Sequence, residues 1–143
     1  MAKPDSALLD PAHYPFHCQI ETRFSDLDAN LHINNVAFTD LLQEGRVRFH
    51  RASNYTGHSA EMTTMVVSLG IEYVGQGFIP DPIDMHVAIG QTGRTSFQLN
   101  QLITQSKRKV LFAQTTLVCV SNGQPCPIPP DFLAEADRWR FAG

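Results

Sequence analysis

The sequence predicts an α+β domain in which one long helix packs against one antiparallel sheet. Apolar residues alternate with polar ones before residue 25 and after residue 65, and they recur at three- and four-residue steps in between. Four strand-like segments then follow at short spacing, which favours antiparallel pairing. With 143 residues, we expect a single domain over 1–143, with an extended lead-in over 1–15 and a Pro-rich exit with a short terminal helix over 124–143.

The first strand is predicted from the segment FHCQIETRF, in which alternate positions share one apolar face: Phe16, Cys18, Ile20 and Phe24. The next segment, SDLDANLHINN over 25–35, is too polar and too rich in asparagine for a strand interior. We therefore expect a loop between the strand and the helix.

The helix is predicted from about Asn35 onward, because apolar and small residues recur there at helical spacing: Phe38, Leu41, Leu42, Gly45, Phe49 and Ala52. Asn34 or Asn35 can cap its first turn, since a short side-chain oxygen can accept a free backbone N–H. Tyr55, Thr56 and Gly57 are expected to end it. About 18 residues give a helix on the order of 27 Å long, which a curved sheet can wrap.

Four further strands are predicted from segments that return to two-residue alternation: VVSLGIEYV, DMHVAIG, TSFQLNQLI and VLFAQTTLVCV. In the first of them, one face is expected to hold Val67, Leu69, Ile71 and Tyr73. The last is apolar on both faces, as expected of a central strand. Turns are expected at 91–94, at SKRK and at Asn122–Gly123, and DFLAEADRW is expected to form the terminal helix.

Composition limits the classes of function. The chain is 43% hydrophobic and 17% charged, so it can form a core, and its formal net charge of −3 argues against nucleic acid as a main partner. The N-terminal segment has no apolar stretch long enough for a signal peptide or a membrane span, so we expect a cytoplasmic protein without a membrane partner. Three cysteines without zinc-like spacing indicate reduced thiols, and no metal or bound cofactor is expected.

The loop before the helix holds the residues that suit catalysis: Asp26, Asp28, His32, Asn34 and Asn35. A helix N-terminus has free N–H groups and a partial positive charge, which suit a developing oxyanion. A nearby carboxylate can attack an acyl group or activate water, and a thiolate leaves readily. The alternative is that these residues only cap the helix and have no catalytic role. A calcium loop is excluded, because Leu31 stands where Gly is needed and Ala37 where the bidentate Glu should be.

The segment RFSDLDANLHINNVAFTDLLQEGRVRF is similar to the 4-hydroxybenzoyl-CoA thioesterase-like branch of the hot-dog superfamily. The shared features are an aromatic-ending strand, the pattern D-x-D-x-x-x-H-x-N-N and an amphipathic helix with Glu and Arg one turn in. The resemblance continues through GRTSFQLNQLI and FAQTTLVCVSNGQPCPIP, so it covers about residues 16–130.

This resemblance implies a hot-dog fold, which is a five-stranded antiparallel sheet wrapped around one long helix. It implies a thioester hydrolase that cleaves acyl-CoA, or sometimes an acyl carrier protein thioester, with coenzyme A entering only as part of the substrate. It also implies a homodimer or homotetramer in which two sheets pair and the active sites form at the interface.

The resemblance assigns roles within the loop. Asp28 matches the family's second loop aspartate, the nucleophile or general base. Asn35 matches the start of the family's helix, where a backbone N–H would polarise the thioester carbonyl. His32 matches a frequent histidine that orients the acyl group or water, unless it makes only a loop hydrogen bond. Leu31 departs from the glycine that many relatives have there, and Asp26 adds a second carboxylate.

Other roles lie outside the loop. Glu44 competes with Asp28 for the role of catalytic carboxylate, because another hot-dog branch has its catalytic Glu on the helix. The alternative is that Glu44 forms an ion pair, with Arg48 at i+4 or with Arg46 across an interface. A turn near the pantetheine and phosphate end of coenzyme A is matched by Arg94, Thr95 and Ser96. On a second turn, Lys107 and Arg108 are exposed cations that could bind the nucleotide phosphates. The alternative is that both only form a solvated surface.

Two other functions stay open at this point. A hot-dog hydratase or dehydratase would use Asp and His five residues apart in a longer loop, whereas Asp28 and His32 are four apart. A non-catalytic binder of acyl-CoA or acyl carrier protein would keep the pocket but would not need Asp28. Neither the acyl group nor the choice between dimer and tetramer follows from the sequence.

Overall fold

The structure is a computed structural model that describes residues 4–53 and 62–143. Its strands are β1 (Phe16–Ile20), β2 (Thr63–Tyr73), β3 (Ile83–Thr92), β4 (Ser96–Gln105), β5 (Arg108–Ser121) and β6 (Gln124–Pro125). Its helices are α1 (Asn35–Ser53) and α2 (Pro130–Ala136), with 3-10 turns η1 (Ser6–Leu9), η2 (Pro11–His13), η3 (Phe24–Asp26) and η4 (Asp137–Trp139). The predicted end of the long helix at 55–57 lies outside the described residues.

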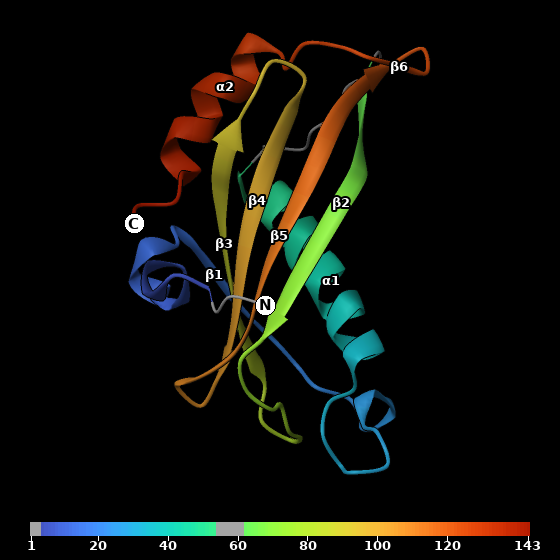
Figure 1. Cartoon of the computed structure of the whole chain (residues 1–143), viewed down its shortest axis with the longest axis vertical. Coiled ribbons are helices and arrows are strands. Elements are labelled where there is room, and N and C mark those ends of the chain that lie inside the picture. The colour runs from blue at the N-terminus through green and yellow to red at the C-terminus, as the bar shows by residue number, and fades with distance from the viewer. Residues whose placement is uncertain (1–3, 54–61) are drawn as a thin grey trace.

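One antiparallel sheet curls around α1, as Figure 1 shows, and the predicted α+β class is confirmed. The strand order is β1-β3-β4-β5-β2, so the predicted central strand, β5, lies between β4 and β2. The sheet has one strand more than predicted, because the chain turns at Asn122 (φ 52°) and Gly123 (φ 74°) and pairs β6 with β5. This arrangement is the one expected of the hot-dog fold.

Strand β2 forms an edge of the sheet. It pairs with β5 and not with β3, so the four later strands do not form consecutive hairpins as the spacing suggested. Val67 is the extra residue of a bulge between Val66 and Ser68 and is exposed. Leu69 and Ile71 pack on the core, and Tyr73 at the end of this edge strand is exposed again. The predicted common face of β2 is therefore only partly buried.

Helix α1 packs an apolar face on the inside of the sheet, where Ala37, Phe38, Leu41, Leu42, Gly45 and Phe49 are buried. Ala52, which was predicted on this face, is exposed. At Gly45, a Cβ would lie 2.7 Å from the Met85 side chain, so the glycine allows the helix to approach β3 closely. None of the helices in 4–53 and 62–143 is long and apolar enough to cross a membrane.

The N-terminal region differs from the sequence prediction in two places. Residues 4–15 are not extended throughout, because the Asp5 and Asp10 side chains accept hydrogen bonds from the backbone N–H groups of Ala7 and Ala12 and start two 3-10 turns. Phe24 does not share the face of β1, because the strand ends at Ile20 and Phe24 begins η3 with 82% of its surface exposed.

Candidate active site

The loop between β1 and α1 is held by the buried Asp26, whose side chain is 1% exposed. One of its carboxylate oxygens accepts the backbone N–H of Arg23 at 2.9 Å, and the other accepts the Arg23 guanidinium at 2.8 Å. Its own carbonyl accepts two hydrogen bonds from Asn34, one from the backbone N–H and one from the side-chain amide. Asp26 therefore positions the loop and is not a second exposed acid beside Asp28.

Asn34 caps α1, as the sequence predicted. Its Oδ1 accepts the backbone N–H of Ala37 at 2.8 Å. The backbone N–H of Asn35, the first helical residue, has no partner among the described residues. A free N–H at a helix N-terminus can donate to an oxygen that gains negative charge. The backbone N–H of Asn35 is therefore a candidate oxyanion donor.

Asp28 is exposed, and only one of its carboxylate oxygens is engaged. Oδ1 accepts the backbone N–H groups of Asn30 at 2.8 Å and His32 at 3.1 Å, while the Asp28 N–H donates to the His32 carbonyl at 2.8 Å. These bonds fix the carboxylate on its turn. Oδ2 makes no hydrogen bond within the described part of the chain, so it is available to a substrate or a water molecule.

Asp28 and Asn35 line one cavity of about 260 Å³, together with Ile33, Phe38, Tyr73, Gly75 and Gln76. The segment after β2 forms the opposite wall, and the Gly77 carbonyl accepts the Ile33 N–H at 2.8 Å. A Cβ on Gly77 would lie 2.9 Å from the Ile33 Cδ1 and the Phe38 Cζ, so any larger residue here would require these side chains to shift. The sequence pattern does not indicate that Tyr73, Gly75 and Gln76 form a wall of this site, because it shows only the end of a strand there.

The ring of His32 does not line this cavity. It packs edge-to-face on Phe78 with 5.1 Å between ring centroids, and the Arg108 guanidinium lies 5.2 Å from the centroid of the same Phe78 ring. Phe78 is held by Gln105, whose side chain bonds the Phe78 N–H and carbonyl. Arg108 is therefore close to the Asp28 loop, on the same side of the structure.

Glu44 lies away from the cavity. It pairs with Arg48 at 3.2 Å, the i+4 alternative expected from the sequence, and it lines a separate hollow with Ile20, Glu21, Arg23, Asp40 and Leu41. Nine residues of helix separate it from Asn35, which is about 13 Å along the axis. Arg46 donates to Gln101 and Thr115 on the inner face of the sheet, within its own chain.

The other residues predicted to contact coenzyme A are not beside Asp28 in this chain. Arg94, Thr95 and Ser96 lie at the turn between β3 and β4, at the opposite end of the sheet from the N-terminus of α1 (Figure 1). Lys107 lines a cavity on the outer face of the sheet, whereas Arg108 reaches Phe78. Only Arg108 of this group is near the candidate site within one chain.

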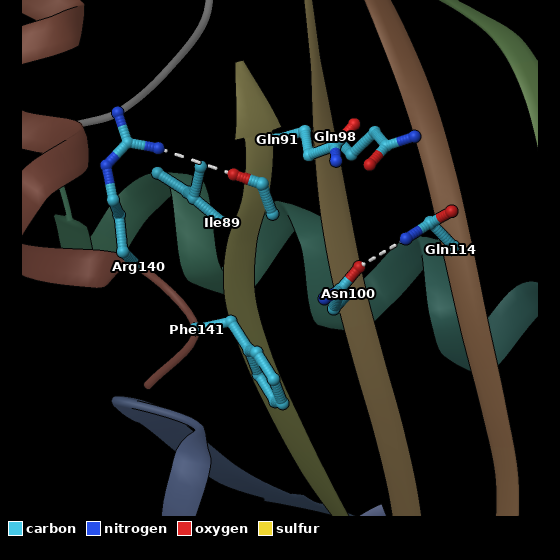
Figure 2. A pocket seen from close by; sticks show the side chains of 8 residues that line it. Ile89, Gln91, Gln98, Asn100, Gln114, Arg140 and Phe141 are labelled. Carbon is cyan, nitrogen blue, oxygen red and sulfur yellow. Dashed lines mark hydrogen bonds between the residues drawn. The ribbon is translucent and has the colours of Figure 1, made fainter. Parts of the chain in front are cut away.

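A larger cavity, of about 380 Å³, lies on the outer face of the sheet between β3, β4, β5 and the C-terminal tail (Figure 2). Its charged side chain, Arg140, is already paired with Asp137 and bonded to the Gly90 carbonyl, and Gln114 donates to Asn100. It contains no carboxylate or nucleophile. Among residues 4–53 and 62–143, no cluster of three or more His, Cys, Asp or Glu could hold a metal ion.

The fold and this site define a hot-dog protein with a loop carboxylate beside the free N-terminus of its central helix. The model of the thioesterase-like superfamily matches residues 22–136, and the chain belongs to this superfamily. The chain is thus a thioester hydrolase, and the family expected from the sequence is confirmed. The comparison with curated proteins gave no match.

Solved structures share the fold at low sequence identity. The PA5185 protein of Pseudomonas aeruginosa superposes with a TM-score of 0.80 at 19% identity, over 93% of this chain and 96% of that one. A thioesterase from Thermus thermophilus, complexed with coenzyme A and Zn, gives 0.76 at 21% identity, over 87% and 92%. A 1,4-dihydroxy-2-naphthoyl-CoA thioesterase from Synechocystis gives 0.74 at 16% identity, over 85% and 95%.

Proposed function

We propose that the protein hydrolyses acyl-CoA thioesters to the free acid and coenzyme A, with Asp28 as the catalytic carboxylate. The observation that carries the proposal is the cavity that is lined both by Asp28 and by Asn35, whose backbone N–H has no partner among the described residues. The N–H would donate a hydrogen bond to the thioester carbonyl oxygen and stabilise its negative charge in the tetrahedral state. The Asp28 Oδ2 would act on the carbonyl carbon or on water.

Two routes fit this geometry. As a general base, Asp28 takes a proton from water, which attacks the carbonyl carbon while the thiolate of coenzyme A leaves. As a nucleophile, Asp28 attacks the carbon itself, expels the thiolate and forms a mixed anhydride, which water then hydrolyses. A single turnover in ¹⁸O-labelled water separates the routes when water attacks the Asp28 side of the anhydride. In the nucleophilic route the label then enters the Asp28 carboxylate first. In the general-base route the label appears in the released acid.

The working unit in this proposal is a homodimer formed through the β2 edge. This edge has unpaired backbone groups and exposed apolar side chains: Met65, Val66 and Val67 are 55%, 48% and 59% exposed. An exposed apolar edge strand favours pairing with another chain. Antiparallel pairing of two β2 strands would continue the sheet across the two-fold axis.

Such a dimer accounts for the position of Arg94. A two-fold axis at the β2 edge would bring the β3–β4 turn of the partner to the end of the sheet where this chain has Asp28. The coenzyme A phosphates would then meet Arg94, Thr95 and Ser96 of one subunit and Arg108 of the other, since exposed guanidinium groups bind phosphate well. His32, beside Phe78, would contact the pantetheine or acyl group as the substrate enters.

The first experiment is release of free thiol from short, long and aromatic acyl-CoAs and from acyl carrier protein thioesters, with wild type and Asp28→Ala. Release by the wild type alone supports the proposal and identifies the acyl group and the carrier. Equal release by both proteins would refute the role of Asp28.

The second experiment mixes two inactive variants, Asp28→Asn and Arg94→Ala, at substrate concentrations below KM. If each site takes Asp28 from one subunit and Arg94 from the other, re-formed mixed dimers have one intact site, and activity returns to about one quarter of wild type. No recovery, with mixed dimers shown by native mass spectrometry, would place both residues in one subunit's site and overturn the shared-site arrangement. The same spectra distinguish a dimer from a tetramer.

A further inference from the structure

A further cavity, of about 320 Å³, lies on the face of the sheet opposite α1. Met85 and Val87 of β3 belong to the core under α1, so strand alternation directs the intervening His86 to the outer face. The lining residues come from β1, β3, β4, the β4–β5 region and the N-terminal turn: His17, Asp84, His86, Thr104, Lys107, Lys109 and Pro11. It is therefore separate from the Asp28 cavity.

A bulge in β5 brings one of the lysines into this cavity. Ile103 pairs with Leu111 but Thr104 pairs with Lys109, so Val110 is an extra residue in β5. Val110 and Leu111 are both fully buried, and Lys109 consequently shares the outer face with Thr104. Without the bulge, alternation would direct Lys109 to the same face as Leu111.

The second lysine is placed by the turn between β4 and β5. Ser106 and Lys107 have φ of 50° and 65°, the left-handed backbone of a tight two-residue hairpin turn. Neither Lys107 nor Lys109 makes an ion pair or a side-chain hydrogen bond within 4–53 and 62–143. Two lysines thus line the cavity, and neither is held in an ion pair by the described residues.

The acids near the cavity are already engaged. Asp84 accepts from His17 at 3.2 Å and from Gln19 at 3.1 Å, and Asp81 beside the turn accepts from Ser106. These bonds do not remove the charge of Asp84, which lines the cavity together with the two lysines, so the lining has two ammonium groups against one carboxylate.

Hydrogen-bonding groups form the floor of the cavity. The His86 Nε2 lies 3.1 Å from the Thr104 hydroxyl, and the rings of His17 and His86 are 5.0 Å apart. Burial lowers the pKa of His86 to about 4, and the neighbouring His17 adds to this shift. The His86 ring is therefore neutral at pH 7. Lys107 and Lys109 supply the positive charge of the cavity, and the His86 imidazole and the Thr104 hydroxyl supply directional hydrogen bonds.

We propose that this cavity binds the phosphate group of a small phosphate monoester, with Lys107 and Lys109 as its charge partners and the Thr104 hydroxyl as a hydrogen-bond donor. Two ammonium groups and an O–H donor match the three oxygens and double negative charge of such a group better than the two oxygens of a carboxylate. The site is distinct from the acyl-CoA site and does not depend on the proposed thioesterase mechanism.

The test uses isotope-labelled full-length protein at pH 7, with inorganic phosphate and glycerol 3-phosphate as probes and sodium chloride as the ionic-strength control. The ring signals of His17 and His86 and the Thr104 amide signal are expected to shift saturably with both phosphates but not with chloride. The double variant Lys107→Gln/Lys109→Gln should bind at least about tenfold more weakly. Arg138→Gln, which removes an exposed charge elsewhere, should bind as the wild type does.

Three results would overturn the proposal: no saturable shift with either phosphate, equal binding by the double variant, or competition between phosphate and coenzyme A for the same signals. The last result would show that the cavity belongs to the substrate site. Because both lysines are exposed, their replacement is not expected to unfold the protein, and an unchanged amide spectrum checks this.

Discussion

Replacing Gly77 by alanine should damage both stability and activity, because the added Cβ would lie 2.9 Å from the Ile33 Cδ1 and the Phe38 Cζ. Ordinary carbon contacts are about 3.5–4.0 Å, so both side chains must move. They are 4% and 3% exposed and belong to the core, and the room for this movement is the Asp28 cavity that both line. Overpacking of this kind costs about 1–3 kcal/mol, and the loss of unfolded-state freedom returns about 0.4–1 kcal/mol. We expect a net loss of about 1–2 kcal/mol in the free energy of unfolding.

Gly70→Ala is the matched control for packing within one chain, since a Cβ there would meet no atom of the described residues within 4 Å. It should be neutral, or more stable by up to about 1 kcal/mol. Urea unfolding at equilibrium measures both variants, and thiol release measures activity. Because Ile33 and Phe38 line the Asp28 cavity, Gly77→Ala should also lower kcat/KM at temperatures where it remains folded. Equal urea midpoints for the two variants would refute the close packing of the 75–78 segment against the loop.

Two further predictions concern the loop and the outer face. Leu31 is 68% exposed and has a left-handed backbone, with φ of 63°. Leu31→Gly removes the strain of this conformation, about 1–2 kcal/mol, and increases the conformational entropy of the unfolded chain, which costs about 0.5–1 kcal/mol. Tm should therefore not fall, and a fall of several degrees would contradict the turn geometry. His86 has its pKa lowered to about 4 by burial, so the folded state disfavours its protonated form. The contribution of neutral His86 to stability is complete above the unfolded pKa of about 6.5 and is lost as pH falls towards 4. Between pH 7 and pH 5, the free energy of unfolding in urea should fall by about 2 kcal/mol more for wild type than for His86→Gln. Equal falls for the two proteins would exclude His86 as the cause.

Much of the fold could be predicted from local patterns. Helical spacing identified the buried face of α1, and Asn34 was a recognisable cap because its role depends only on neighbours in sequence. The alternation rule failed at Phe24, where a 3-10 turn replaces the strand, and on β2, where a bulge and an edge position expose Val67 and Tyr73. Edge position and register arise from pairing between distant strands, which periodicity does not contain.

The candidate site could be predicted only in part, for the same reason. Asp28 and Asn35 are close in sequence, and the structure places both at one cavity. In the sequence Asp26 is only a second carboxylate near Asp28, and its burial on Arg23 depends on a 3-10 turn that the sequence pattern does not indicate. The distance of Arg94 from Asp28 within one chain, and the opposite directions of Lys107 and Arg108, follow from the three-dimensional course of β4 and β5.

The central claim is that Asp28 performs the chemistry beside the Asn35 N–H, and Asp28→Asn tests it most directly. The amide keeps an oxygen that can accept the Asn30 and His32 N–H groups, so the turn should survive while the carboxylate is lost.

The deciding measurement is kcat and KM for thiol release by wild type, Asp28→Asn and the matched acid variant Glu44→Gln. We predict that Asp28→Asn lowers kcat by about 10²–10⁴-fold with KM nearly unchanged, and that Glu44→Gln stays within about threefold of wild type. The opposite result, with activity retained in Asp28→Asn and lost in Glu44→Gln, would move the catalytic carboxylate to the helix and contradict the account.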